Sequence, residues 1–216
     1  MKIEILYPEI CTLYGDKGNT MYLQKCLPDA EFVTTGLNEK PLFLKENIDM
    51  VYMCSMSEKS QELVLDRLMQ YKDEIAACMK DGKALFLLVG NSMELLGDYI
   101  KREDGTHIHH PGMYSVRQTP NRFNTLIKAK FNDMTLIGYT SRFAHTYGIP
   151  DDMTFCKVEI GQGSNPDTMN EGICKNRVIA TYIHGPLLIQ NPDFVHYLLK
   201  KLDAPMKEIP FEAAMR

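Results

Sequence analysis

A wholly apolar run, Ala84–Val89, leads directly into Gly90 and then into a segment with the spacing of a helix. Apolar runs of this kind are typical of strands that are buried on both faces of a parallel sheet. A second such run, Met50–Cys54, lies upstream, and the segment between the two has helical apolar spacing. The sequence therefore predicts a strand, helix and strand crossover. It places Gly90 at the carboxyl end of a central strand, where open α/β sheets bind their ligands.

The connecting helix is expected to begin at a capping box formed by Ser55 and Glu58 and to stop at Gly82. Its expected core-facing residues are Leu65, Leu68, Ile75 and Met79.

Flanking segments complete one expected domain over residues 1–216. Ile3–Tyr7 and Phe32–Thr34 have strand character, and a short helix is predicted over Thr20–Leu27. A last helix is expected to begin near Asn191 and Pro192. Five strand-like runs separated by turn signals predict an antiparallel extension: Tyr114–Val116, Leu126–Phe131, Leu136–Tyr139, Phe155–Ile160 and Val178–Ile183. The predicted fold is α/β, a three-layer open sheet with a parallel core, similar to flavodoxin.

Composition excludes several classes of function. The net charge is −4 with no run of Lys or Arg, which argues against nucleic acid as a partner. No apolar stretch approaches the roughly 20 residues of a membrane span, and the first residues form no signal peptide, so we expect a cytoplasmic protein without membrane insertion. The six cysteines form no CxxC pair and are interpreted as buried free thiols. The cluster of His107, His109 and His110 is interpreted as an exposed loop, so we expect no metal and no cofactor.

The turn at Gly90 has the pattern of a nucleophile elbow, a sharp turn between strand and helix that presents one side chain at the top of an α/β sheet. The residue presented here would be Gly90, which has no side chain. Ser92 lies two residues later, inside the first helical turn, and is interpreted as a cap.

Three further blocks carry a resemblance. They are Leu13–Asn19 with its two glycines, Gly161-x-Gly163-x-Asn165 followed by Glu171-Gly172, and Thr181–Leu188 with its Tyr-x-His-Gly-Pro segment. In this order, and together with the elbow, they resemble the class I glutamine amidotransferases of the cobyric acid synthase type. Within that family the chain is most similar to the glutaminase subunits of lipid II isoglutaminyl synthases, which suggests peptidoglycan precursor amidation.

The resemblance implies a mechanism whose parts are altered here. In the family a cysteine thiolate at the elbow attacks the amide of glutamine, a histidine acts as base and acid, and backbone N–H groups hold the oxyanion. Ammonia then passes to a partner synthetase. Gly90 stands at the cysteine position and His184 at the histidine position. The glycine-rich oxyanion loop corresponds to Met53–Ser57, which has no glycine, and the Asn-His-x-Gly-Arg-Thr segment corresponds to Ser141–Thr146.

The resemblance also suggests the remaining site residues. Asn91, Ser55, Arg142 and His145 are candidates for binding glutamine or another small amide in the cleft. Asp16 would either orient His184 or cap the helix that follows it. Cys54, at the end of the neighbouring strand, is an alternative nucleophile that would have to approach His184.

Three hypotheses remain open. The first is a pseudoenzyme that serves as partner or scaffold of a Mur-ligase-like synthetase. The second is an enzyme of altered chemistry that uses His184 with Cys54, Ser92 or Asp16. The third is a small-molecule sensor for an amino acid or a nucleotide. A site filled by Met53, Met56 and Met93 would favour the first, whereas an open polar cleft around His184 would favour the other two.

Overall fold

We describe a computed structural model of the chain, which covers residues 1–102, 104, 107–109, 114–205 and 208–215. Its strands are β1 (Lys2–Leu6), β2 (Glu31–Thr35), β3 (Met50–Met53), β4 (Leu85–Val89), β5 (Tyr99–Lys101), β6 (His107–His109), β7 (Ser115–Phe131), β8 (Met134–Tyr147), β9 (Thr154–Ile160), β10 (Asn170–Lys175) and β11 (Val178–Thr181). Its α-helices are α1 (Lys17–Cys26), α2 (Glu58–Met69), α3 (Lys72–Asp81), α4 (Leu187–Gln190), α5 (Pro192–Lys201) and α6 (Glu212–Met215).

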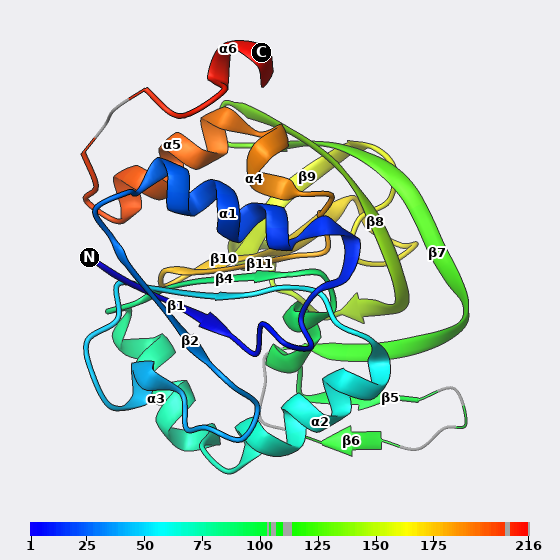
Figure 1. Cartoon of the computed structure of the whole chain (residues 1–216). Coiled ribbons are helices and arrows are strands. Elements are labelled where there is room, and N and C mark those ends of the chain that lie inside the picture. Colours follow the sequence, from blue (N-terminus) through cyan, green and yellow to red (C-terminus); the bar gives the residue numbers. More distant parts are fainter. Residues whose placement is uncertain (103, 105–106, 110–113, 206–207, 216) are drawn as a thin grey trace.

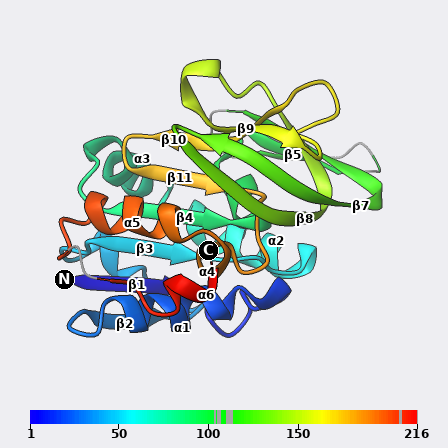
Figure 2. The same cartoon turned by 90° about the horizontal axis from the view of Figure 1, so that it is seen from above.

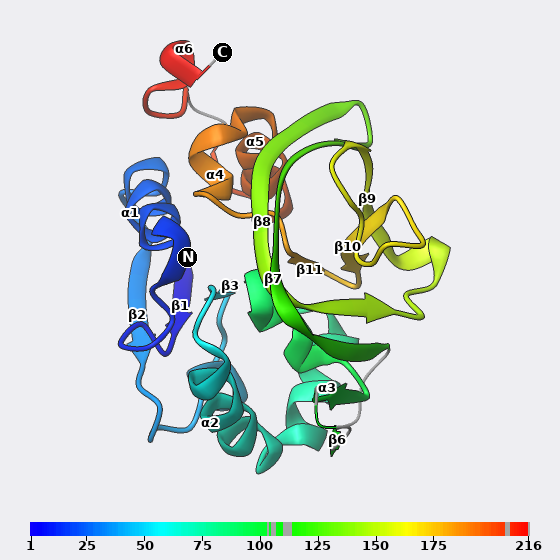
Figure 3. The same cartoon turned by 90° about the vertical axis from the view of Figure 1, so that its right-hand side faces the viewer.

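The expected three-layer α/β fold is confirmed. Strands β2, β1, β3, β4 and β11 lie side by side in this order, and every neighbouring pair is parallel. Helices α1, α4 and α5 cover one face of these strands, and α2 and α3 cover the other (Figures 1 and 3). The two central strands, β3 and β4, are buried along their whole length, as their unbroken apolar sequence predicts.

The antiparallel extension is also confirmed, although its strands are longer than predicted. β10, β9 and β7 continue the sheet beyond β11, and each of these neighbouring pairs is antiparallel. β7 joins two runs that were predicted to be separate strands, because the chain passes Pro120 with only a shift of register between Gln118 and Phe123. β7 and β8 form a long curved hairpin at the side of the sheet (Figure 2). Strands β5, β6 and β10 were not predicted.

The helical connection between β3 and β4 differs from its prediction in two ways. The N-cap of α2 is Ser57, whose hydroxyl accepts a hydrogen bond from the Ser60 N–H, so the predicted capping box at Ser55 was wrong. The connection is also two helices, because α2 ends at Met69 and α3 begins at Lys72. Gly82, in the left-handed conformation, caps the end of α3 as expected.

Two other features correct or limit the predictions. The backbone of residues 107–109 forms strand β6 instead of a loop, and His110 lies outside the described residues. Among the described residues, no helix is both long enough and apolar enough to cross a membrane.

Candidate active site at the Gly90 turn

The predicted elbow forms at the carboxyl end of β4. Gly90 has a φ of +68°, the left-handed conformation that favours glycine, and the chain continues into a tight 3-10 helix, Gly90–Leu96. A predicted α-helical start is therefore a 3-10 helix. Because β3 and β11 flank β4 in parallel, the residues after all three strands meet at this edge. Gly90, Ser55 and His184 come from these three strand ends.

The space that a side chain at position 90 would need is occupied by Ser55. A Cβ built on Gly90 would overlap the Ser55 Oγ and would lie 2.9 Å from the Ser55 Cβ. A Cβ atom does not approach non-bonded atoms this closely, so a side chain at position 90 requires Ser55 to move. The side chain of Ser55, in the loop after β3, therefore occupies the space that the Cβ of a residue at position 90 would take.

Ser55 is held in this position by Asp16. The Asp16 Oδ2 accepts hydrogen bonds from the Ser55 N–H at 3.3 Å and from the Ser55 Oγ at 3.0 Å. The Asp16 Oδ1 accepts a hydrogen bond from the Asn19 Nδ2 at 3.3 Å. The carboxyl is completely buried, and burial raises its pKa to about 7 against the opposing effect of the Ser55 hydrogen bonds.

Asp16 thus has neither of the two roles expected from the sequence, which were to cap the following helix or to orient His184. It precedes α1, but its side chain makes no hydrogen bond to the first helical N–H groups. Its side-chain partners in the described part of the chain are Ser55 and Asn19 instead of His184.

The backbone amide of Met56, in the same loop as Ser55, is bound by the Asn91 side chain. The Asn91 Oδ1 accepts from the Met56 N–H at 2.9 Å, and its Nδ2 donates to the Met56 carbonyl at 2.8 Å. The Gln61 side chain donates to the Asn91 carbonyl at 2.8 Å. The N–H groups of Ser55 and Met56, in the loop that the resemblance assigns to the oxyanion, therefore already have partners within the chain.

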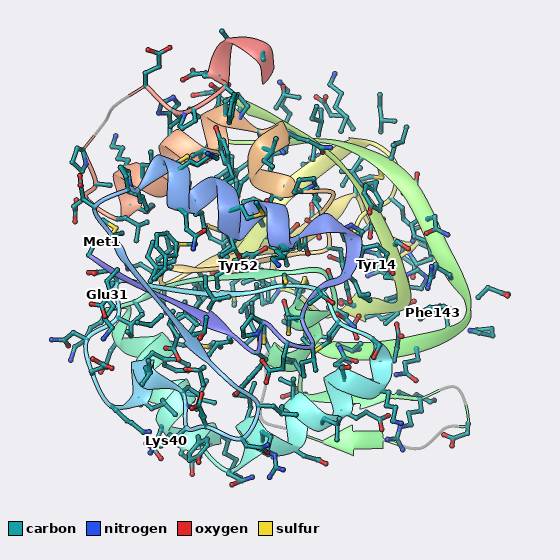
Figure 4. The ribbon with its side chains drawn as sticks, viewed as in Figure 1. Met1, Tyr14, Glu31, Lys40, Tyr52 and Phe143 are labelled. Carbon is teal, nitrogen blue, oxygen red and sulfur yellow. The ribbon has the colours of Figure 1, made fainter. Side chains whose placement is uncertain are left out.

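His184 is a buried, neutral histidine. Its Nε2 accepts a hydrogen bond from the Ser141 N–H at 3.0 Å, so the proton of the neutral ring is on Nδ1. Burial lowers its pKa to about 4. Tyr14 stacks on the imidazole with ring centres 4.3 Å apart, and Tyr139 meets it edge-on at 4.4 Å. Figure 4 shows Tyr14 on the segment that leads into α1, beside β8.

The two alternative nucleophiles are held by their own hydrogen bonds. The buried Cys54 Sγ donates to the Cys11 carbonyl at 2.7 Å, and burial raises the pKa of this thiol far above its usual value. The buried Ser92 Oγ lies 2.8 Å from the Val89 carbonyl and 3.1 Å from that of Met53. Both groups are therefore protonated donors, and a base that could activate either is not among these partners.

Arg142 belongs to a buried polar network that the sequence reasoning did not identify. Its Nη2 donates to the Gly163 carbonyl at 2.6 Å, and its guanidinium lies 4.2 Å from the centre of the Tyr182 ring. The Tyr182 hydroxyl bonds the Glu94 carboxyl at 3.2 Å. The Tyr182 N–H donates to the Glu171 Oε1 at 2.7 Å. Glu171 and Tyr182 lie in the quoted blocks, and Glu94, between Met93 and Leu95, is the residue whose hydrophobic neighbours in sequence indicate burial.

His145 lies beside this network, and its side chain is half-buried. Burial and the nearby Arg142 guanidinium lower its pKa, so the ring is neutral at pH 7. Burial also raises the pKa of Glu94 to about 7. Arg142 and His145 therefore share one region, whereas Ser55 and Asn91 share the loop region near Gly90.

The three methionines that would fill the site under the first hypothesis are buried in the structure. Met53, Met56 and Met93 are all buried, with exposed fractions of 3%, 1% and 0%. The group that meets a side chain at position 90 is nevertheless Ser55. The site is closed by a polar contact in addition to apolar packing.

Residues 2–192 match a protein family described as the CobB/CobQ-like glutamine amidotransferase domain. The chain belongs to this family. A similar protein is the "Lipid II isoglutaminyl synthase (glutamine-hydrolyzing) subunit GatD" of Streptococcus pneumoniae, 25% identical over 206 residues that cover 92% of this chain and 79% of the relative. The subunit of the same name from Staphylococcus aureus is 26% identical over 205 residues, covering 93% and 83%.

Solved structures support the same fold. A crystal structure of a glutamine amidotransferase superimposes with a TM-score of 0.59 at 10% identity, covering 93% of this chain and 99% of that chain. PurLQS from Thermotoga maritima superimposes with a TM-score of 0.54 at 12% identity, covering 85% and 86%.

The chemistry open to this glutamine amidotransferase domain follows from the contacts above. Acyl transfer from an amide needs a nucleophile, a base with a free lone pair and donors that face the oxyanion. Position 90 offers no nucleophile, the His184 lone pair accepts from Ser141, and the two loop N–H groups are bound to Asp16 and Asn91. The Ser55 and Met56 N–H groups and the His184 Nε2 thus have partners within the chain, whereas the His184 Nδ1 is buried without one among the described residues.

Proposed function

We propose that this protein is a non-catalytic glutamine amidotransferase-like subunit that binds a Mur-ligase-like synthetase in peptidoglycan precursor amidation. The observation that carries the proposal is the occupation of the nucleophile position by Ser55. A missing cysteine alone would leave an empty elbow, whereas here the Ser55 side chain occupies the space of a Cβ at position 90 and the buried carboxyl group of Asp16 holds it there. The absence of a side chain at position 90 is thus complemented by the Ser55 side chain of the loop after β3.

The pathway is inferred from the relatives. Both are named as subunits of lipid II isoglutaminyl synthase, and they align with more than nine-tenths of this chain. A subunit that has lost glutamine hydrolysis can retain the surface that docks on a synthetase, since fold and docking surface depend on residues other than the nucleophile. The synthetase would then take free ammonia.

The experiment measures the nitrogen source of the assembled complex. The protein is purified with the Mur-ligase-like synthetase of the same organism, and amidation of a lipid II acceptor is followed with glutamine or with ammonium as donor. We expect the two proteins to co-elute, amidation with ammonium, and no amidation or ammonia release with glutamine. Losing the nucleophile of such a catalytic unit lowers the rate by on the order of 10⁶, so the expected glutaminase rate is at background.

Two variants serve as controls. Gly90→Cys alone is expected to remain inactive because Ser55 blocks the new side chain. His184→Ala is expected to leave both the amidation with ammonium and the co-elution with the synthetase unchanged, because the proposed function does not use this histidine as a base. Ammonia release by the wild type, abolished in Cys54→Ala, would instead establish an active enzyme. Failure to co-elute with the synthetase would remove the scaffold role.

A further inference from the structure

An apolar cavity of about 500 Å³ lies between the α2 and α3 helices and the underlying sheet. Its floor includes Phe86 and Leu88 of β4 and Val178 of β11, which are all buried. None of Gly90, Ser55, Asp16 and His184 lines it, although Met53 does, so the cavity adjoins the candidate active site without including its polar groups. Its volume lies within the roughly 300–1,000 Å³ that is usual for small-molecule pockets.

Helix α3, which lies over this cavity, has apolar side chains that are not buried. No residue of α3 is buried, although Ile75 and Met79, four residues apart, both line the cavity. Leu68 and Met69 at the end of α2 line it too and are only partly buried. Protein interiors are normally packed without voids of this size, so these apolar side chains face a space that favours an apolar occupant.

The cationic side chains at the cavity specify the charge of that occupant. Lys72 at the start of α3, Lys80 near its end and Lys175 at the end of β10 all line the cavity. Lys175 binds the Asp152 carboxylate at 2.8 Å. Within the described part of the chain, Lys72 and Lys80 make no ion pair. No carboxylate is among the lining residues.

Lys80 lies where several elements meet at one end of the cavity. The end of α3 approaches the turn between β10 and β11, since a Cβ on Gly82 would lie 3.5 Å from the Asn176 carbonyl. Asn176 and Lys175 line the cavity at this same turn. The end of α3, with Lys80, and the turn that carries Lys175 and Asn176 therefore contribute polar side chains to the lining of a cavity that is mostly apolar.

We propose that this cavity binds a single-chain anionic amphiphile, an alkyl chain with a terminal carboxylate, with its chain between α2/α3 and the sheet and its carboxylate at Lys80. Charge complementarity and the nearly apolar lining favour this class over a neutral or cationic ligand. The site is independent of glutamine chemistry and is tested without reference to it.

The test is equilibrium dialysis of radiolabelled tetradecanoate against the full chain, below the micelle concentration of the fatty acid. We expect saturable binding of one molecule. Each added methylene between decanoate and tetradecanoate should lower the Kd about fourfold, because moving one CH₂ group from water into the apolar cavity is favourable by about 0.8 kcal/mol. Binding that does not saturate, or a Kd that is independent of chain length, would overturn the proposal and leave the cavity to a partner's apolar segment.

Matched variants locate the site. Leu68→Glu introduces a carboxylate into the lining and is expected to raise the Kd at least about tenfold, because the chain then meets an unpaired charge. Leu63→Glu on the same helix, at a position that is 48% exposed and outside the lining, should leave the Kd unchanged. Circular dichroism verifies that both variants are folded. Equal loss of binding in both would contradict this site.

A charge variant tests the orientation. Lys80→Gln is expected to weaken tetradecanoate about two- to fivefold, the effect of one partly exposed ion pair, and to leave tetradecanol binding unchanged. The matched control is Lys59→Gln on α2, an exposed lysine outside the cavity lining. Unchanged tetradecanoate binding in Lys80→Gln would overturn the placement of the carboxylate.

Discussion

At the scale of single residues, position 90 and position 55 have to be considered as a pair. Gly90 tolerates a φ of +68°, which an L side chain adopts only at a cost of about 1–2 kcal/mol. The Ser55 Oγ and Cβ add a steric obstacle to any side chain there. Ser55 in turn supplies two of the hydrogen bonds to the buried Asp16. A cysteine at position 90 would therefore require Ser55 to move.

We therefore predict strong coupling between the two positions. Gly90→Cys should lower the free energy of unfolding by more than about 2 kcal/mol, from backbone strain and overpacking. Ser55→Gly should be destabilising alone, because Asp16 loses its hydroxyl donor. The double variant Ser55→Gly/Gly90→Cys should be more stable than the sum of the two effects by about 1–3 kcal/mol.

Urea unfolding of the four proteins gives this coupling free energy directly. A control pair that shares no contact, Gly90→Cys with Asn121→Ala at an exposed position of β7, should be additive. Additivity between positions 55 and 90 would mean that Ser55 moves aside freely, and the steric basis of the proposed inactivity would fail.

At the scale of elements, the 3-10 helix after Gly90 acts as a brace for the loop after β3. Asn91 bonds both the N–H and the carbonyl of Met56, and the Gln61 side chain of α2 links the Asn91 carbonyl to the Glu94 carboxyl. This brace keeps the loop closed at the strand ends. It is built from side-chain amides that substitute for backbone partners.

Removing the brace should loosen the loop without unfolding the protein. Asn91→Ala leaves the Met56 N–H and carbonyl without these partners, and we expect a loss of about 1–3 kcal/mol in the free energy of unfolding. Hydrogen exchange of the Met56 amide should accelerate, whereas that of β4 should not. Asn121→Ala is again the control. Unchanged exchange at Met56 would show that the loop is held by other contacts.

These elements also show how far the sequence predicts the structure. The buried strands β3 and β4 and the sharp turn at Gly90 followed from local pattern, because burial on both faces and a tight turn at glycine leave a direct trace in sequence. The cap at Ser57 did not, because the hydroxyl of the better-placed Ser55 is bound by Asp16, 39 residues away in sequence. Tertiary contacts of this kind, including the Arg142 and Tyr182 pair, are invisible to local pattern.

At the scale of the whole molecule, the buried groups Asp16, Glu94 and His184 are among those that link stability to pH. Asp16 and Glu94 have pKa values raised to about 7 by burial, so the native protein holds protons that the unfolded chain releases at lower pH. His184 has a pKa lowered to about 4, so it is neutral where the unfolded chain binds a proton. The carboxyls therefore reduce stability as pH rises toward 7, and the histidine reduces it as pH falls below 6.5.

Between about pH 4.5 and 6.5 the native protein holds two carboxyl protons that the unfolded chain has lost, and the unfolded chain holds one histidine proton that the native protein has lost. With this net difference of one proton, these three groups together lower the free energy of unfolding as pH rises, at about 1.4 kcal/mol per pH unit.

The variant Asp16→Asn isolates the contribution of one carboxyl group. Relative to the wild type, the variant should gain on the order of 2 kcal/mol between pH 5 and 7, because asparagine is not charged when the buried carboxylate would be, and gain little above pH 7. Urea unfolding at each pH measures the difference, with Asp133→Asn at the exposed tip of the β7–β8 hairpin as control. A difference that stays constant from pH 5 to 8 would mean that the Ser55 and Asn19 hydrogen bonds keep Asp16 ionised throughout, and the closed site would then be held by a permanent charge instead of a neutral acid.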